Sequence, residues 1–322
     1  MRNIKNNWLV QVIGFVLVLI MTGLTAQGLS RIMPPYYLQI GFFIGINVIM
    51  ALGLNLIAGA TGQLSLGHSA FMSIGAYASA IATVTLHLPF PVGILLGGLA
   101  ACLFGIVIGF PTLRLSGDYL AIATLGFAEI VRVIFTNMQI TGGAIGFLGI
   151  KNLTTFPVIM ILTVAMIAVM MWLENSRNGR AMLAVREDEI AAESVGVNIT
   201  WYKIQAFAIG SFCAGVGGAL FAHTTTFIQP TDFGFMKSIE FLNMVVLGGL
   251  GSIPGTIIGS VVLTTAPEFL RFMANYRMLV YGLLLIIMMI FRPHGLLGGF
   301  NFRQAISRAL FLGRRIRQGA KV

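Results

Sequence analysis

Long apolar runs separated by short polar breaks are the feature that most constrains how this chain can fold. A helix needs about 20 mostly apolar residues to cross the hydrocarbon core of a bilayer, and such runs recur along most of the chain. Only 9% of the 322 residues are charged and 57% are hydrophobic, whereas a typical soluble domain has roughly 25% charged residues. The sequence therefore predicts an all-α, polytopic membrane protein.

The polar breaks divide the chain into roughly ten predicted transmembrane helices of the length that a bilayer requires. Prolines and glycines mark many of the helix ends. The predicted membrane domain covers residues 1–298, and a basic tail covers 299–322. We expect helices over about 8–25, 37–57, 68–86, 92–110, 119–135, 156–173 and 204–227, two apolar pieces within 238–270, and a last helix over 278–291.

Two glycine-rich breaks lie within apolar helices, one in each half of the chain. Irregular backbone at membrane depth is tolerated only where surrounding protein or a water-filled cavity satisfies its hydrogen bonds. Corresponding broken helices in two halves indicate a duplicated transporter whose pathway lies between the repeats, although most small residues in the helices are expected only to pack. The candidate pathway residues are Gly62, Gln63, Ser65, Gly67 and His68 in the first break, and Gly248, Gly249, Gly251 and Ser252 in the second.

A polar stretch over residues 174–203 interrupts the apolar pattern and holds half of the ten acidic residues. We expect residues 179–186 to continue the preceding helix and 187–196 to form a second, short helix. Acids in its first turn suit the helix dipole, and Gly196 suits its end. The small apolar face of this helix fits a groove on another protein, or the stretch is a solvated connector without a partner.

The charges indicate which side of the membrane this stretch occupies. With a cytoplasmic N-terminus, fourteen of the twenty basic residues fall on the inner side and five on the outer side. This is the asymmetry that the positive-inside rule expects, so the polar stretch and both termini are predicted to be cytoplasmic. The net charge is +10, and seven of the twenty basic residues follow position 291 with no acid among them. A basic tail after a last apolar helix favours anionic lipid over nucleic acid as its partner.

Motifs of enzymes and cofactor sites are missing from the sequence. It contains no Gly-Lys-Ser/Thr phosphate loop, no dinucleotide-binding fingerprint and no histidine pair at metal-binding spacing. We therefore predict a protein that is not an enzyme and binds no cofactor, with any ATP hydrolysed by partner subunits. Glu129 and Arg132 lie three residues apart and are predicted to form a structural pair near the outer interface or, alternatively, a gate.

Four separated blocks carry a family resemblance. The sequences GLNLIAGATGQLSLGHSAFMSIGAYASA (53–80), GDYLAIATLGFAEIVRVIFTN (117–137), SRNGRAMLAVREDEIAAESVGVN (176–198) and VLGGLGSIPGTIIGSVVL (246–263) resemble the LivM branch of the LivH/LivM permeases. Those permeases are membrane subunits of ATP-binding-cassette importers for branched-chain amino acids. The resemblance implies a permease fold like that of type II importers, in a bacterial inner membrane. It also implies a LivH-like second permease, two ATPase subunits and a periplasmic binding protein that delivers Leu, Ile or Val.

The resemblance also implies that the segment over about 176–198, called the coupling segment below, docks on an ATPase. The residues implied for this contact are Arg180, Arg186, Glu187, Asp188, Glu189, Ala192 and Gly196. Related permeases serve urea and short amides, so these substrates are an alternative. Two other readings are an ion-coupled secondary transporter with Glu129 or Glu240 as proton carrier, and a structural anchor for other subunits.

Overall fold

The computed structural model describes residues 3–112, 115, 117–270, 280, 282–283, 286, 290–291 and 295–296. Over this part of the chain the fold is all-α, as the sequence predicts, and the only β-type pairing is a bridge between Phe147 and Ile228. Arg114, most of the predicted helix over 278–291 and the whole basic tail lie outside the described residues. The helices are α1 (Asn3–Ile32), α2 (Pro35–Leu54), α3 (His68–Ala80), α4 (Phe90–Thr112), α5 (Asp118–Asn137), α6 (Phe156–Asn175), α7 (Arg177–Glu187), α8 (Glu189–Ser194), α9 (Ile199–Thr225), α10 (Phe235–Gly248) and α11 (Ile253–Phe269).

Five of these helical segments are long and apolar enough to cross a membrane within the described part of the chain. One of them joins α2 to the π-helical turn that follows it, and a shorter apolar helix ends α1. The five segments are Pro35–Ala60, Phe90–Pro111, Asp118–Asn137, Phe156–Asn175 and Ile199–Thr225. The chain is therefore a multi-pass membrane protein.

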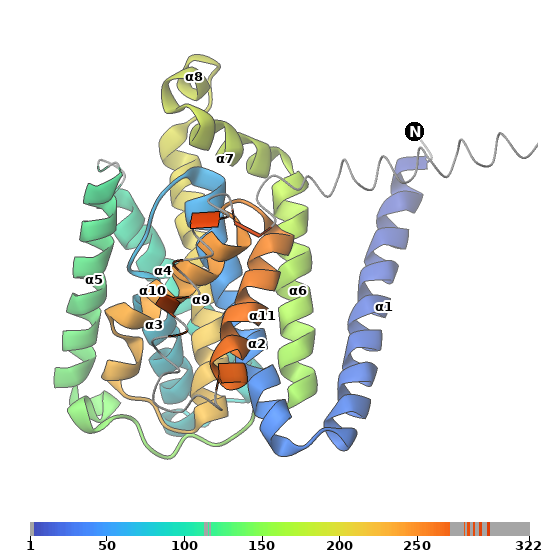
Figure 1. The fold of residues 1–322 in the computed structure, drawn as a ribbon, viewed down its shortest axis with the longest axis vertical. Coiled ribbons are helices and arrows are strands. Elements are labelled where there is room, and N and C mark those ends of the chain that lie inside the picture. Colours follow the sequence, from blue (N-terminus) through green and yellow to red (C-terminus); the bar gives the residue numbers. More distant parts are fainter. Residues whose placement is uncertain are drawn as a thin grey trace, which may run out of the picture.

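Helix α9 is the centre of the helical packing, with α2, α3 and α4 against it. Small residues allow the close approach: a Cβ on Gly210 would lie 2.7 Å from the Gly53 carbonyl oxygen, and one on Gly215 would lie 2.6 Å from that of Gly97. In a membrane such small-residue contacts bring helix backbones together. Helix α1 packs on α6 at one edge of the molecule, and α5 forms the opposite edge (Figure 1).

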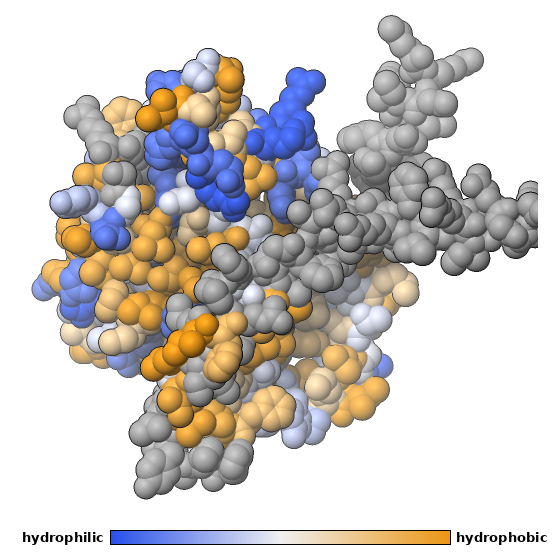
Figure 2. All heavy atoms as spheres, turned by 45° about the horizontal axis from the view of Figure 1, so that its top comes forward, coloured by the Kyte–Doolittle hydropathy of each residue, from blue (hydrophilic) through white to orange (hydrophobic). Residues whose placement is uncertain are grey.

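Helices α7 and α8 project beyond the membrane-spanning helices at one end of the molecule (Figure 1). Hydrophilic side chains gather over that end, whereas the flanks are largely hydrophobic (Figure 2). This distribution matches a bundle immersed in lipid with the coupling segment in water.

Capping side chains set the helix ends around the coupling segment, and they correct three expected boundaries. The hydroxyl of Ser176 accepts a hydrogen bond from the Gly179 amide at 3.1 Å, so α7 starts anew instead of continuing α6. Asp188 caps α8, and Glu187 therefore ends α7 rather than opening the second helix. Asn198 caps α9, which begins five residues before the predicted start at 204, because the side-chain oxygen of Asn198 accepts from the next turn.

Candidate functional site

The first glycine break is a π-helical turn followed by an extended loop. Residues Asn55–Ala60 widen the end of α2 into a π-helix, a distortion that is frequent at functional sites. The hydroxyl of Thr61 donates to the Ile57 carbonyl at 2.7 Å, and the Gln63 amide donates to the same carbonyl at 3.2 Å. Gly62 has φ +71°, a left-handed conformation that glycine adopts without a steric penalty. These bonds define how α2 ends and leave the loop over 62–67 free of helix.

The second break separates α10 from α11. Gly249 has φ +108° and Gly251 has φ +82°, so side chains at these two positions would strain the backbone. The hydroxyl of Ser252 then accepts a hydrogen bond from the Gly255 amide at 3.2 Å and caps α11. The Leu296 amide donates to the Leu247 carbonyl at 2.7 Å, which places the chain after the last predicted helix beside this break.

The structure brings the two breaks into direct contact. The side-chain oxygen of Asn55 accepts a hydrogen bond from the backbone amide of Gly251 at 2.8 Å. A Cβ on Gly59 would overlap the backbone of Gly251. Both glycines are therefore needed for this approach, and Asn55 satisfies an amide that the broken helix leaves without a helical partner.

Arg186 of the coupling segment docks at the same point. Its Nη1 donates a hydrogen bond to the Gly59 carbonyl at 2.8 Å, and its Nη2 lies 2.6 Å from the carboxylate of Glu187. A Cβ on Gly251 would lie 2.5 Å from Nη1, and one on Gly62 would lie 3.2 Å from the Arg186 Cγ. One guanidinium thus contacts both breaks and an exposed acid, and it links the coupling segment to the interrupted helices.

The other residues of the coupling segment divide between anchors and exposed positions. Arg180 donates to the Asn175 carbonyl at 2.9 Å, and Glu189 pairs with the buried Lys203 of α9 at 2.6 Å. Ala192 is buried on the inner side of α8, and Gly196 follows the end of α8 with φ +85°. On the outer side Ile190 is 82% exposed and Val195 is 77% exposed. Among the residues that the structure describes, little covers these two apolar side chains, so the apolar face expected from the sequence is open to another molecule.

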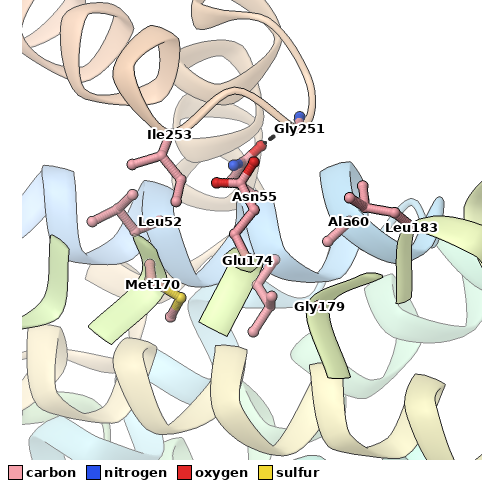
Figure 3. A pocket seen from close by; sticks show the side chains of 10 residues that line it. Leu52, Asn55, Ala60, Met170, Glu174, Gly179, Leu183, Gly251 and Ile253 are labelled. Carbon is pink, nitrogen blue, oxygen red and sulfur yellow. Dashed lines mark hydrogen bonds between the residues drawn. The ribbon is translucent and has the colours of Figure 1, made fainter. Parts of the chain in front are cut away.

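A groove and a small cavity lie beside this segment. The groove is open, has a volume of about 580 Å³, and runs between α8 and the start of α9 with Glu189, Glu193 and Lys203 in its walls. The cavity lies between α2, α6 and the second break, and in it the side chains of Asn55 and Glu174 point toward one another (Figure 3). Its volume of about 30 Å³ suits a water molecule and is far below the roughly 300–1,000 Å³ of small-molecule sites.

The predicted pathway residues lie mostly inside the helix packing. His68 is fully buried and its Nε2 lies 3.0 Å from the Met50 carbonyl oxygen. Gln63 and Ser65 are also buried. Gly248 packs backbone to backbone against Gly255 at the second break. In this conformation, therefore, these residues hold helices together, and an open route along them requires the breaks to move.

The comparison with protein families decides what kind of molecule this is. The family described as the permease component of branched-chain amino acid transport systems matches residues 36–289. The chain belongs to this permease family. Its match covers both breaks, the coupling segment and α5, so the geometry described above is that of a branched-chain amino acid permease.

Two of the most similar curated relatives are permease proteins named LivM. The high-affinity branched-chain amino acid permease protein LivM of Salmonella typhimurium is 39% identical over 78% of this chain and 68% of that protein. LivM of Escherichia coli is 38% identical over the same shares. LivH of Salmonella typhimurium, a second permease protein of such a system, is 34% identical over 51% of this chain and 54% of its own length. No solved structure matches the chain.

Sequence reasoning missed two residues that hold this permease together at its breaks. Asn55 lies within an apolar run and was not singled out from the sequence. A single amide in such a run does indicate a buried contact, because a polar side chain at membrane depth needs a partner. Thr124 of α5 accepts a hydrogen bond from the Leu66 amide at 3.0 Å. Its hydroxyl therefore fixes the loop of the first break, and only the folded chain shows this role.

Proposed function

We propose that this chain is a membrane permease subunit of an ATP-binding-cassette importer that translocates the branched-chain amino acids Leu, Ile and Val. A periplasmic binding protein delivers the amino acid, two ATPase subunits bind the coupling segment, and a LivH-like permease completes the membrane part. The family match supports the substrate class, and the contact of Arg186 with the first break is the observation that carries the mechanism.

We also propose how the chain is arranged in the membrane. The membrane domain covers residues 1–298 with roughly ten transmembrane helices, two broken-helix repeats and a fold like that of type II importers. The protein resides in a bacterial inner membrane with both termini and the basic tail 299–322 in the cytoplasm. Support comes from the inner-side excess of basic residues and from the two breaks that meet at Gly251.

Coupling begins at α8. The exposed side chains of Ile190 and Val195 sit in a groove of the ATPase, and the acids Glu187, Asp188 and Glu189 flank that contact. When ATP draws the two ATPase subunits together, α7 and α8 move as one unit because Asp188 caps α8 directly at the end of α7. Arg180 and Lys203 keep this unit attached to α6 and α9.

Movement of α7 then reaches the breaks through Arg186. Its guanidinium pulls on the Gly59 carbonyl and shifts against Gly251, so the two broken helices change their angle together. Irregular backbone at Gly62 and Gly249 absorbs the rotation, since left-handed glycines tolerate large changes in φ and ψ. The pathway residues, from Gln63 to His68 and from Gly248 to Ser252, part and form a weakly binding route. Weak binding suits release, because affinity resides in the delivery protein.

Reconstitution tests this function. The complete transporter in proteoliposomes takes up leucine only with ATP inside, both ATPase subunits present and the binding protein outside. The chain alone, given a pH gradient and no ATP, takes up no leucine. Uptake by the chain alone would contradict the proposal and favour an ion-coupled carrier, and uptake of urea with exclusion of leucine would contradict the substrate class.

A further inference from the structure

Helix α5 carries an ion pair on its outward face. The Nε of Arg132 lies 3.0 Å from both carboxylate oxygens of Glu129. The side chain of Glu129 is 52% exposed and that of Arg132 is 32% exposed. Glu129 is the twelfth of the twenty residues of α5, about 16 Å along a helix that rises 1.5 Å per residue. The exposed pair therefore sits near the middle of a membrane-spanning helix.

The other membrane-spanning segments in the described part of the chain place their acids and bases near their ends, as with Glu174 and Lys203. The exposed face of α4 is apolar, with Leu99 50% exposed and Leu103 62% exposed. Such a face suits lipid tails, whereas ionisable groups at membrane depth face protein or water. The outward face of α5 therefore differs from a lipid-facing surface.

Gly126 provides an independent observation on the same face. It lies one turn before Glu129, and a Cβ placed on it would meet nothing within 4 Å. Glycine weakens a helix interior relative to alanine, and no contact within the described part of the chain requires it here. In membranes a glycine on an exposed helix face allows the backbone of another helix to approach. The open space at Gly126 therefore suits a helix from a second membrane protein.

The opposite side of α5 holds the first break. The Thr124 hydroxyl accepts a hydrogen bond from the Leu66 amide at 3.0 Å, and a Cβ on Gly67 would overlap the Thr124 backbone. Helix α5 thus lies between the first break and the molecule that contacts its outer face. A partner on that face is one helix diameter away from the moving parts.

We propose that the outer face of α5 is the docking surface for the second permease subunit. The face is defined by Ile122, Gly126, Glu129, Ile130 and Val133, which share one side of the helix. Only a membrane-embedded partner reaches groups at this depth, which excludes the cytoplasmic ATPases and the binding protein. The occupant is a LivH-type permease, because this family contains two kinds of related permease protein. The inference rests on the proposed function, since it needs a paired permease.

Site-specific photo-crosslinking in the complete transporter tests this surface. A benzophenone amino acid replaces Ile122 or Ile130 on α5, and Leu99 or Leu103 on α4 as matched controls, in cells that also express the LivH-type permease of the same organism. We expect a product containing both permeases from the α5 positions, at least fivefold above that from the α4 positions. Products with lipid only, products with a second copy of this chain, or equal yields from α4 would overturn the proposal.

Two further measurements separate the possible failures. G126L should reduce co-purification of the second permease about tenfold, while L103A on α4 leaves it unchanged. Unreduced co-purification of a folded G126L variant would contradict the docking surface, and the crosslinking result stands even if that variant fails to fold. Leucine uptake is measured in the same wild-type cells: uptake without α5 crosslinks rejects only this interface, whereas no ATP-dependent uptake rejects the proposed function itself.

Discussion

The Nη1 atom of Arg186 lies 2.8 Å from the carbonyl oxygen of Gly59, although the two residues are 127 positions apart in the chain. This bond joins the last turn of α7, outside the membrane helices, to the π-helical turn that begins the first break. The same guanidinium lies beside Gly251 of the second break. A displacement of the coupling segment therefore acts on both breaks through a single side chain.

Asn55→Leu should destabilise the contact between the two breaks. It removes the oxygen that accepts the Gly251 amide while keeping a side chain of similar size. A buried amide left without an acceptor costs about 1–3 kcal/mol. Thermal unfolding of the purified transporter measures the loss. Asn175→Leu, at the exposed end of α6, is the control and should stay within roughly 0.5 kcal/mol of wild type. Equal midpoints for the two variants would show that the Asn55 bond is not important for stability.

Gly59→Ala and Gly251→Ala should both impair folding and transport. A Cβ on Gly59 would overlap the backbone of Gly251, and a Cβ on Gly251 would lie 2.5 Å from the Arg186 guanidinium. Gly251 also has a left-handed φ. Overpacking of this kind costs about 1–3 kcal/mol, so the unfolding midpoint falls by several degrees and leucine uptake declines. Gly28→Ala, where a Cβ meets nothing within 4 Å, serves as the control and leaves both unchanged. Wild-type stability of the Gly59 variant would contradict the tight junction.

Ile190→Asp should weaken binding of the ATPase subunits without disturbing the membrane domain. Ile190 is 82% exposed at the tip of α8, so a charge there costs the fold little, but it is costly in an apolar groove of a partner. Truncation of buried anchor residues typically costs at least about 2 kcal/mol of binding energy, which predicts a roughly tenfold or greater loss of co-purified ATPase. The control is Ile145→Asp. Ile145 follows the C-terminal end of α5 and is 76% exposed, and this variant should retain the ATPase. Equal retention by both variants would place the ATPase contact elsewhere.

The helices were predictable because each depends on local sequence. Apolar length gave α4 and α6 to within a few residues. The polar stretch at 174–203 does hold helical segments over 177–187 and 189–194, but its ends belong to α6 and α9. The starts of α7, α8 and α9 differ from those expected because each is set by a capping side chain, namely Ser176, Asp188 and Asn198. Whether such a residue caps a helix depends on its backbone conformation.

The junction of the breaks was not predictable, because it depends on contacts between residues distant in sequence. Asn55 and Gly251 are 196 positions apart, and no local pattern indicates that an amide in one apolar run accepts a hydrogen bond from a glycine in another. The assignment of His68 and the other break residues to a transport pathway stays a prediction, since most of them are packed between helices here.

Transport stoichiometry in an Arg186→Ala variant tests the central claim most directly. Leucine imported per ATP hydrolysed is measured in proteoliposomes that contain the complete transporter, with Arg177→Ala, an exposed change on the same helix, as control. Loss of a hydrogen bond from a charged group is worth about 1.5–3 kcal/mol, so we predict at least a tenfold fall in leucine imported per ATP, while ATPase subunits stay bound and hydrolyse ATP. An unchanged ratio in Arg186→Ala would contradict the account.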